Sequence, residues 1–580
     1  MPTAKNALML PVRAAVTLPM LLAAGLAAAQ TPTQGLRDIE SQIEEAGPRP
    51  GPARVEVPRA SIVAPQGADG ITLDIVEIAL VGRDGAPVAD DRRLPLDPIR
   101  ARLAAQAGQR MTLAQVYATA REIEVGLKAD GFVFTRVLVP RQELDQAAAR
   151  VQIVLLGVSV EKVVIEEPAD AVGPVSELIA KLAAPLEGLS NPRIQDLERA
   201  SLLATDLPGI TRATFVPGPG STPDTIVLSL NVERDVWNAV GLVTHHDSPV
   251  IGPGVIGGIG YLNSYTSFAA STELAYFNSW SFDGFPDFDE RNTVQLTQRG
   301  FLDWGTELWA SALYSHTKPG DFLEPLDLSG DQYEFRLGAE HPVLRSRDLS
   351  LWVNGGFDWI DSTVDFSGNV ATLTDDSLRV IHLGARAGMA DAWGATSADI
   401  TLRKGLDILG ASEEGDTNLS RFDGTGDFFL LRGEIAREQP IWREVSGHVR
   451  IAGQWSPDTV LANEGFALGG ARYLKAYDPS EALGDSGFAA YGELRYTDQV
   501  TFRGVDFGYE FYGFADYGIV FQTDLPGDNS TDLASSGGGV RFQLPAGPRF
   551  EIEMAVPLAE PLLRTGERDL RVFGSLVWFL

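Results

Sequence analysis

The sequence predicts two small α+β modules followed by an all-β transmembrane barrel of about 16 antiparallel strands. Two observations support this division. Residues 1–234 carry 23 basic and 28 acidic groups (net −5), whereas residues 235–580 carry 24 and 50 (net −26). The hydrophobic period also changes at this boundary, from the mixed helix and strand periods of the first part to strict alternation in the second.

The composition excludes several classes of function. The chain of 580 residues has a net charge of −31, and nucleic-acid binding would instead need clustered Lys and Arg. It contains no cysteine, which excludes disulfides, thiolate metal sites and cysteine nucleophiles.

The N-terminus predicts a signal peptide over residues 1–29. Lys5 and Arg13 are the only charges before residue 30, and the apolar run Ala14–Ala29 ends in three alanines. The alternative is a membrane anchor, but a spanning helix needs roughly 20 apolar residues, which this run lacks. No later stretch reaches 18 uninterrupted apolar residues, so we expect no transmembrane helix.

A short helix and a linker follow the signal. Leu36, Ile39 and Ile43 have helical spacing, and we assign residues 30–46 to one short helix. Residues 47–70 are rich in proline and are expected to be an extended linker.

The two α+β modules are predicted at 71–157 and 158–234. The first reads as strand Ile71–Val81, a helix capped at Asp97-Pro98 and stopping at Gly108, a helix with a Thr112/Gln115 capping box, and strands Phe132–Val139 and Ala149–Leu156. The second reads as strand Val158–Ile165, helix Val175–Ala184, a helix capped at Asn191-Pro192, and strands Thr211–Val216 and Thr225–Val232. Exported tandem modules without polar clusters suggest binding, because their free sheet edges accept an extended strand; rigid spacers are the alternative.

Residues 235–580 show the alternation of a transmembrane barrel. From Val505 to Ile519 the odd positions are apolar or small, and the even positions include Asp506, Glu510 and Asp516. Further strands are expected at Thr306–His316, Gln332–Ala339, Leu349–Trp359 and Leu570–Leu580, with turns and surface loops at 281–290, 412–426 and 522–536. A water-soluble sandwich is the alternative, but export and a strand at the C-terminus favour the barrel.

Motifs that would carry chemistry are weak in this chain. Gly252–Gly257 matches a dinucleotide fingerprint but lacks the following helix. Gly484–Gly487 resembles a serine-protease nucleophile loop but is not followed by a second glycine. We expect His245-His246 to lie at the surface, because no third metal ligand is spaced to join them. We therefore expect no catalytic residues, no cofactor and no metal.

The second half contains motifs of a known family. Gly469–Asp478, which includes Arg472, Leu474, Lys475, Ala476 and Tyr477, is followed by Gly484, Asp485 and Gly487. This run resembles the long-loop motif of the hemolysin secretion/activation proteins, the outer-membrane transporters of two-partner secretion. Phe514, Asp516 and Gly518 match the family's Phe-x-Asp-x-Gly strand motif. Pro140, Gln142 and Asp206–Gly209 resemble parts of its periplasmic POTRA modules.

The resemblance implies two periplasmic POTRA domains, a 16-strand barrel in the outer-membrane lipid, a plug-like N-terminal helix and an inward-folded loop. It implies translocation of a large, β-helical exoprotein bound through the POTRA domains, without a cofactor. Three positions depart from the family pattern: Lys475 replaces Arg, Ala476 replaces Gly, and Leu580 replaces the terminal Phe. We expect the Ala476 change to restrict the loop backbone.

The resemblance and the alternation together predict one specific contact. Asp516 falls on the lumen-facing side of its strand, and the family motif places a basic residue on the inward loop. We expect Lys475, or Arg472 in its place, to pair with Asp516; alternatively, Asp516 contacts only water and neighbouring strands.

Three other functions compete with secretion. An assembly factor of the same superfamily typically carries more POTRA modules than the two for which this chain has room. A passive porin does not need periplasmic binding modules. An enzyme would require an acid/base or nucleophile constellation, which the sequence lacks.

Overall fold

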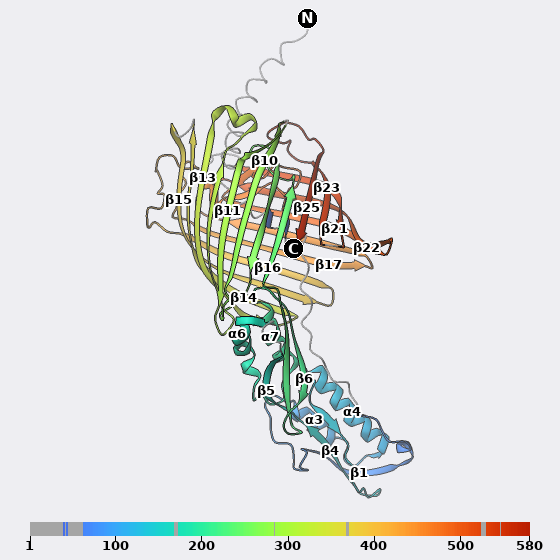
Figure 1. The fold of residues 1–580 in the computed structure, drawn as a ribbon. Coiled ribbons are helices and arrows are strands. Elements are labelled where there is room, and N and C mark those ends of the chain that lie inside the picture. The colour runs from blue at the N-terminus through green and yellow to red at the C-terminus, as the bar shows by residue number, and fades with distance from the viewer. Residues whose placement is uncertain are drawn as a thin grey trace. The chain divides into compact units, whose positions relative to one another are not determined.

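The computed structural model describes residues 39, 40, 42, 43, 62–166, 172–283, 285–366, 370–523, 529–545 and 547–580. The chain divides into two compact units, one formed by Gly51–Asp235 with Ser264–Ala269, and the other by the barrel together with the N-terminal segment (Figure 1). The predicted signal peptide, the remainder of 30–46 and linker residues 47–61 lie outside the described residues. Within the described part, no helix is long and apolar enough to cross a membrane.

The first module is a four-stranded sheet of order β2-β1-β4-β3 with two helices. Its elements are β1 (Thr72–Val81), α3 (Leu96–Ala104), β2 (Arg110–Thr112), α4 (Leu113–Ala129), β3 (Arg136–Leu138) and β4 (Ala149–Leu156). The Thr112/Gln115 capping box starts α4, as the sequence predicts. Val116, Ala120 and Leu127 on one face of α4 are buried against the sheet, which gives this small module its core.

The second module is a three-stranded sheet of order β5-β7-β6. Its elements are β5 (Ser159–Glu166), α6 (Ser176–Ala183), α7 (Ile194–Thr205), β6 (Ile210–Pro219) and β7 (Thr225–Arg234). The two modules meet through polar contacts: the Asn191 amide donates to Asp91 at 2.7 Å, and the Ile194 N–H donates to the Gly131 carbonyl at 2.9 Å. Apart from the short strand β2, the elements of both modules follow the predicted order of strand, helices and strands.

Two predicted helix caps and one predicted strand are wrong in detail. Helix α3 begins at Leu96, so Asp97 lies in its first turn. Helix α7 has Arg193 at its N-cap; Asn191 instead adopts a positive φ of 48° and uses its side chain to reach the first module. Residues 132–135 are not in a strand, because Phe132 and Phe134 both turn into the core.

In the described part of the chain, sixteen antiparallel strands close a barrel in sequence order, which confirms the predicted fold class. The strands are β8 (Trp237–Thr244), β9 (Gly254–Leu262), β10 (Ser271–Asp283), β11 (Phe285–Phe301), β12 (Glu307–Thr317), β13 (Leu328–Arg345), β14 (Leu349–Phe366), β15 (Ala371–Asp391), β16 (Gly394–Gly405), β17 (Phe429–Trp442), β18 (Val445–Trp455), β21 (Ser486–Phe502), β22 (Val505–Phe521), β23 (Ser530–Gln543), β24 (Arg549–Pro557) and β25 (Arg571–Phe579). β25 pairs with β8 and closes the ring.

Strand β22 shows why the sequence alternates. Phe511 and Tyr517 are exposed on the outer face, whereas Tyr512, Phe514 and Asp516 are buried on the inner face. The odd residues therefore face lipid and the even residues face the lumen, as predicted. The loop prediction at 281–290 is wrong for the described residues, because 281–283 belongs to β10 and 285–290 to β11. The prediction at 522–536 is partly wrong, because 530–536 belongs to β23; polar residues there extend the strands instead of ending them.

Candidate functional site

The segment between β18 and β21, residues 456–485, folds into the barrel and is called the inward loop below. It contains a short ribbon, β19 (Phe466–Leu468) with β20 (Ala482–Gly484), and a bend between them. Leu474, Ala476 and Tyr477 in that bend, the tip of the loop, are 0% exposed. They pack among lumen-facing residues of β21–β25, including Ala489, Tyr491, Phe514, Leu533 and Phe573. Apolar burial therefore holds the tip against one wall of the lumen.

The backbone of the tip is bent at Leu474, not at Ala476. Gly469, Gly470 and Leu474 have positive φ angles of 103°, 109° and 59°, and Ala476 does not belong to the residues of positive φ. The expected restriction at Ala476 is therefore wrong, because that position uses ordinary backbone geometry. Its N–H lies 3.4 Å from the Ser535 hydroxyl, and its carbonyl accepts from Arg571 at 3.1 Å.

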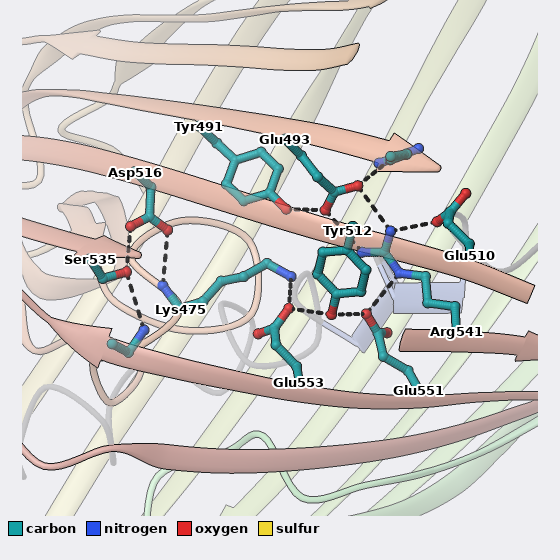
Figure 2. A network of polar contacts seen from close by, with 12 residues as sticks. Lys475, Tyr491, Glu493, Glu510, Tyr512, Asp516, Ser535, Arg541, Glu551 and Glu553 are labelled. Carbon is teal, nitrogen blue, oxygen red and sulfur yellow. Dashed lines mark hydrogen bonds and ion pairs between the residues drawn. The ribbon is translucent and has the colours of Figure 1, made fainter. Parts of the chain in front are cut away.

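The strand motif of β22 forms the seat of this tip. Gly518 leaves room for the loop, because a Cβ there would lie 2.7 Å from Leu468 and 3.0 Å from Leu474. The Asp516 carboxylate accepts from the main-chain N–H of Lys475 at 3.1 Å and from the Ser535 hydroxyl. The loop and strand residues selected from the sequence thus meet in the lumen (Figure 2).

The predicted ion pair has a different carboxylate. The Lys475 ammonium donates to Glu553 on β24 at 2.8 Å, and only its main-chain N–H is bonded to Asp516 (Figure 2). The bent tip presents its amide to β22, so the lysine stem extends past the rings of Tyr491 and Phe514, with the ammonium 5.5 and 5.4 Å from their centroids. Both side chains of the pair are buried. The expected pairing of Lys475 with Asp516 is therefore wrong in its partner.

Glu553 belongs to a polar network that the sequence reasoning missed. The Tyr512 hydroxyl contacts Glu551 at 2.6 Å and Glu553 at 2.8 Å. Arg541 on β23 contacts Glu493 at 2.9 Å, Glu510 at 2.7 Å and Glu551 at 2.8 Å (Figure 2). Glu510 and Glu551 stand directly opposite Arg541 in the strand register, which places opposite charges side by side. The available signal was a pair of glutamates two residues apart in a spanning strand.

Arg472, the expected substitute for Lys475, anchors the loop elsewhere. Its guanidinium binds Glu434 on β17 through two contacts of 2.5 and 3.2 Å, and the Tyr473 hydroxyl donates to the same carboxylate at 2.9 Å. On the other side of the tip, Asp478 pairs with Arg571 on β25 at 2.6 Å. The tip is thus tied to several strands by charged contacts.

Comparison with known proteins shows which family this barrel and its inward loop resemble. Residues 303–542 match the profile described as haemolysin secretion/activation protein ShlB/FhaC/HecB, and residues 86–155 match the POTRA domain of ShlB type. Over its barrel the chain matches the haemolysin secretion/activation proteins.

Relatives and solved structures cover nearly the whole length. The heme/hemopexin transporter protein HuxB of Haemophilus influenzae is 21% identical over 574 residues, which are 94% of this chain and 95% of that protein. CdiB from Escherichia coli is similar in structure with a TM-score of 0.70, at 16% identity, covering 96% of this chain and 98% of that one. CdiB from Acinetobacter baumannii gives a TM-score of 0.62 at 15% identity, covering 95% and 98%.

These matches and the closed barrel identify the chain as an outer-membrane transporter whose POTRA domains lie in the periplasm. Because β7 leads directly into β8, the N-terminal end of β8 faces the periplasm. The inward loop, which joins the end of β18 to the start of β21, therefore enters the lumen from the cell surface.

The described residues of the N-terminal segment lie in the lumen of the barrel. Residues 39, 40, 42 and 43 are helical, and Ile39 and Ile43 are buried. They pack against lumen-facing apolar residues of β8, β9, β10, β12 and β25, which are Val240, Leu242, Val255, Ile259, Ala275, Phe277, Leu313 and Val577. Gln42 and Lys475 both line one cavity of 30 Å³, so this helix adjoins the tip of the inward loop.

The remaining predicted residues lie away from the tip. Gly484, Asp485 and Gly487 stand where β20 meets β21, at the base of the inward loop. His245 is exposed, whereas His246 is half-buried and stacks on Phe573 with ring centroids 3.9 Å apart, so its expected surface position is wrong. Among the described residues, no group of His, Cys, Asp or Glu is arranged to hold a metal.

Proposed function

We propose that this transporter binds an unfolded exoprotein through its two POTRA modules and secretes it through the barrel, with the inward loop as the element that must rearrange. The observation that supports this proposal is that the inward loop occupies the lumen and is held there by polar contacts. The tip is held by contacts such as Lys475–Glu553 and Arg472–Glu434, which are individually reversible. A covalent or wholly apolar plug would have no such discrete release points.

The free edge of β6 in the second module supports a specific mode of client binding. The opposite edge, β5, is covered: the Val160 N–H donates to Leu189 and the Val160 carbonyl accepts from Gly188. In the described part of this sheet, β6 is the strand at the other edge, and its Ala213 carbonyl accepts from the Ser201 hydroxyl of α7. An extended client strand would pair along this edge, as in β-augmentation.

A proline variant tests this mode. Ala213→Pro removes one main-chain N–H of the edge strand β6, whereas Ala213→Val keeps that N–H and is the matched control. We expect the proline variant to reduce both binding of a candidate exoprotein's N-terminal domain to the full-length transporter and its secretion into the medium. Equal binding by the proline and valine variants would contradict edge pairing.

The energy for export requires a source other than ATP, which the periplasm does not offer. We infer that folding of the exoprotein outside the cell draws the chain through the barrel. An exoprotein variant that cannot fold should therefore stall in the transporter, and its normal release into the medium would contradict this inference.

A further inference from the structure

The base of the inward loop is closed by the motif that resembles a protease nucleophile loop. Ser486 bonds across the base to Ser456, accepting from its N–H at 3.0 Å and donating to its carbonyl at 3.2 Å. The Gln454 amide donates to the Asp485 carbonyl at 3.0 Å. We call this region, where residues 454–462 meet 484–487, the neck of the loop.

One fully buried carboxylate joins the segments that meet at the neck. Asp485 is 0% exposed. Its Oδ1 accepts from the Val460 N–H at 2.9 Å, which ties the incoming limb of the loop to the outgoing limb. Its Oδ2 accepts from the Thr523 N–H at 2.7 Å and lies 3.3 Å from the Arg421 guanidinium. Charge-assisted bonds to a buried carboxylate are the strongest of the ordinary hydrogen bonds.

The surface loop 406–428 holds the incoming limb at two further points. The Ala462 N–H donates to the Ser420 hydroxyl at 2.9 Å, and the Thr425 N–H donates to the Thr459 carbonyl at 3.1 Å. Together with Arg421, these contacts grip both limbs from the cell-surface side. The neck is therefore a clamp in which the two limbs are held by loop 406–428 and by Thr523, which follows β22.

The glycines of the motif follow from the same geometry. A Cβ at Gly484 would lie 2.7 Å from the Phe521 carbonyl oxygen, and one at Gly487 would lie 2.4 Å from the Phe466 ring. Neither position has room for a side chain, because β22 and the loop's own ribbon pack directly against the backbone. Each residue type in Gly-Asp-Ser-Gly thus serves closure of the neck.

We propose that Asp485 is a positioning residue for secretion, which clamps the neck so that the tip is presented to Asp516 and Glu553. The idea rests on the proposed secretion function. Asp485 does not touch the client. By joining the two limbs at the neck, it fixes the point from which they separate. The neck stays closed while the residues of the tip exchange their contacts with the barrel strands.

The test combines a deletion of the carboxylate with a reversible staple. Asp485→Ala should reduce secretion at least tenfold while leaving a heat-modifiable barrel in the outer membrane. Asp416→Ala is the matched control, because this acidic residue of loop 406–428 only accepts from the Glu413 N–H within its own turn and should secrete within about twofold of the parent. Arg421→Gln should give an intermediate loss, and it serves if Asp485→Ala fails to assemble.

The staple uses the lack of native cysteine. Ala467 and Leu483 stand directly opposite in the β19–β20 ribbon, so Ala467→Cys with Leu483→Cys places the only two thiols of the protein within disulfide range. In the Asp485→Ala background, the oxidised staple should restore secretion to within about twofold of the parent, and a reductant should abolish that rescue. A purely structural defect of the barrel would not respond to the redox state of the staple.

Three results would overturn the proposal: parental secretion by Asp485→Ala, no rescue by the oxidised staple, or a block of secretion by the staple in the otherwise unchanged protein. The last would mean that the neck has to open. If the unchanged transporter fails to secrete the exoprotein at all, the proposed function fails instead, so the two failures are distinguishable.

Discussion

The Lys475–Glu553 pair provides a quantitative test of how the inward loop is held. Its nitrogen and oxygen are 2.8 Å apart, and the side chains are 9% and 3% exposed. A hydrogen bond to a charged group contributes about 1.5–3 kcal/mol, and removing one member of a buried pair costs about 3–5 kcal/mol because the other charge stays buried. Lys475→Met and Glu553→Gln should therefore each shift the ratio of open to closed loop by roughly 100-fold or more, since about 1.4 kcal/mol corresponds to tenfold.

A double-mutant cycle separates the two carboxylates near Lys475. Lys475→Met keeps the main-chain N–H, which is the group that Asp516 binds. The coupling between Lys475→Met and Glu553→Gln should therefore be about 1.5–3 kcal/mol, and that between Lys475→Met and Asp516→Asn should be smaller, because the Lys475 ammonium makes its hydrogen bond to Glu553.

Single-channel recording in planar bilayers measures this coupling through the open probability of each variant, and secretion of an exoprotein provides a second readout. The heat-modifiable mobility of each variant controls for barrel assembly. A larger coupling of Lys475 with Asp516 than with Glu553 would refute the reasoning. It would mean that the Lys475 side chain, and not its main-chain amide, binds Asp516 on β22.

Three further predictions follow from the described contacts. Gly518→Ala should weaken loop docking by about 1–3 kcal/mol, because the new methyl lies 2.7 Å from Leu468, and its channel should open more often in bilayer recordings. Arg541→Gln should lower the temperature at which the barrel loses its heat-modifiable form, since buried Glu493 and partly buried Glu510 and Glu551 all lose this cation; an unchanged transition would contradict the network. In the second POTRA module, the Ser221 N–H and then the Thr225 hydroxyl lower the pKa of Glu161 below its ordinary 4.5. The stability from this group is therefore present above pH 4.5 and is lost as the pH falls through its lowered pKa, so Glu161→Gln should flatten the pH dependence of POTRA unfolding in urea between pH 5 and 3.

The sequence predicted the architecture because lipid and water impose opposite demands on the two faces of each strand. That rule determines the alternation in β22 and the side of Asp516 before any coordinates are known. The helix α4 was equally predictable, since its capping box and its buried face depend on residues within a few turns of one another. The fold could therefore be predicted from local and periodic patterns in the sequence.

The partner of Lys475 was beyond such reasoning. Motif logic pairs charges by type, and it assigned the ammonium to Asp516. The positive φ at Leu474 turns the main-chain amide toward that carboxylate and directs the side chain to Glu553, which lies 78 residues further along the chain. The predicted cap of α7 was wrong for a related reason: the Asn191 side chain makes a contact between the modules, which no local pattern records.

The bond between Asp516 and the amide of residue 475 bears on how such transporters diverge. A contact made through the main chain is indifferent to the side chain beside it, so the strand aspartate can remain while the loop residue drifts between lysine and arginine. A glycine is likewise not required at 476, because the positive φ of the bend lies at residue 474. Searches for distant homologues that demand Arg-Gly in the loop would discard chains like this one, whereas a search for the strand pattern Phe-x-Asp-x-Gly, whose glycine is fixed by the space that Leu468 and Leu474 occupy, would retain them.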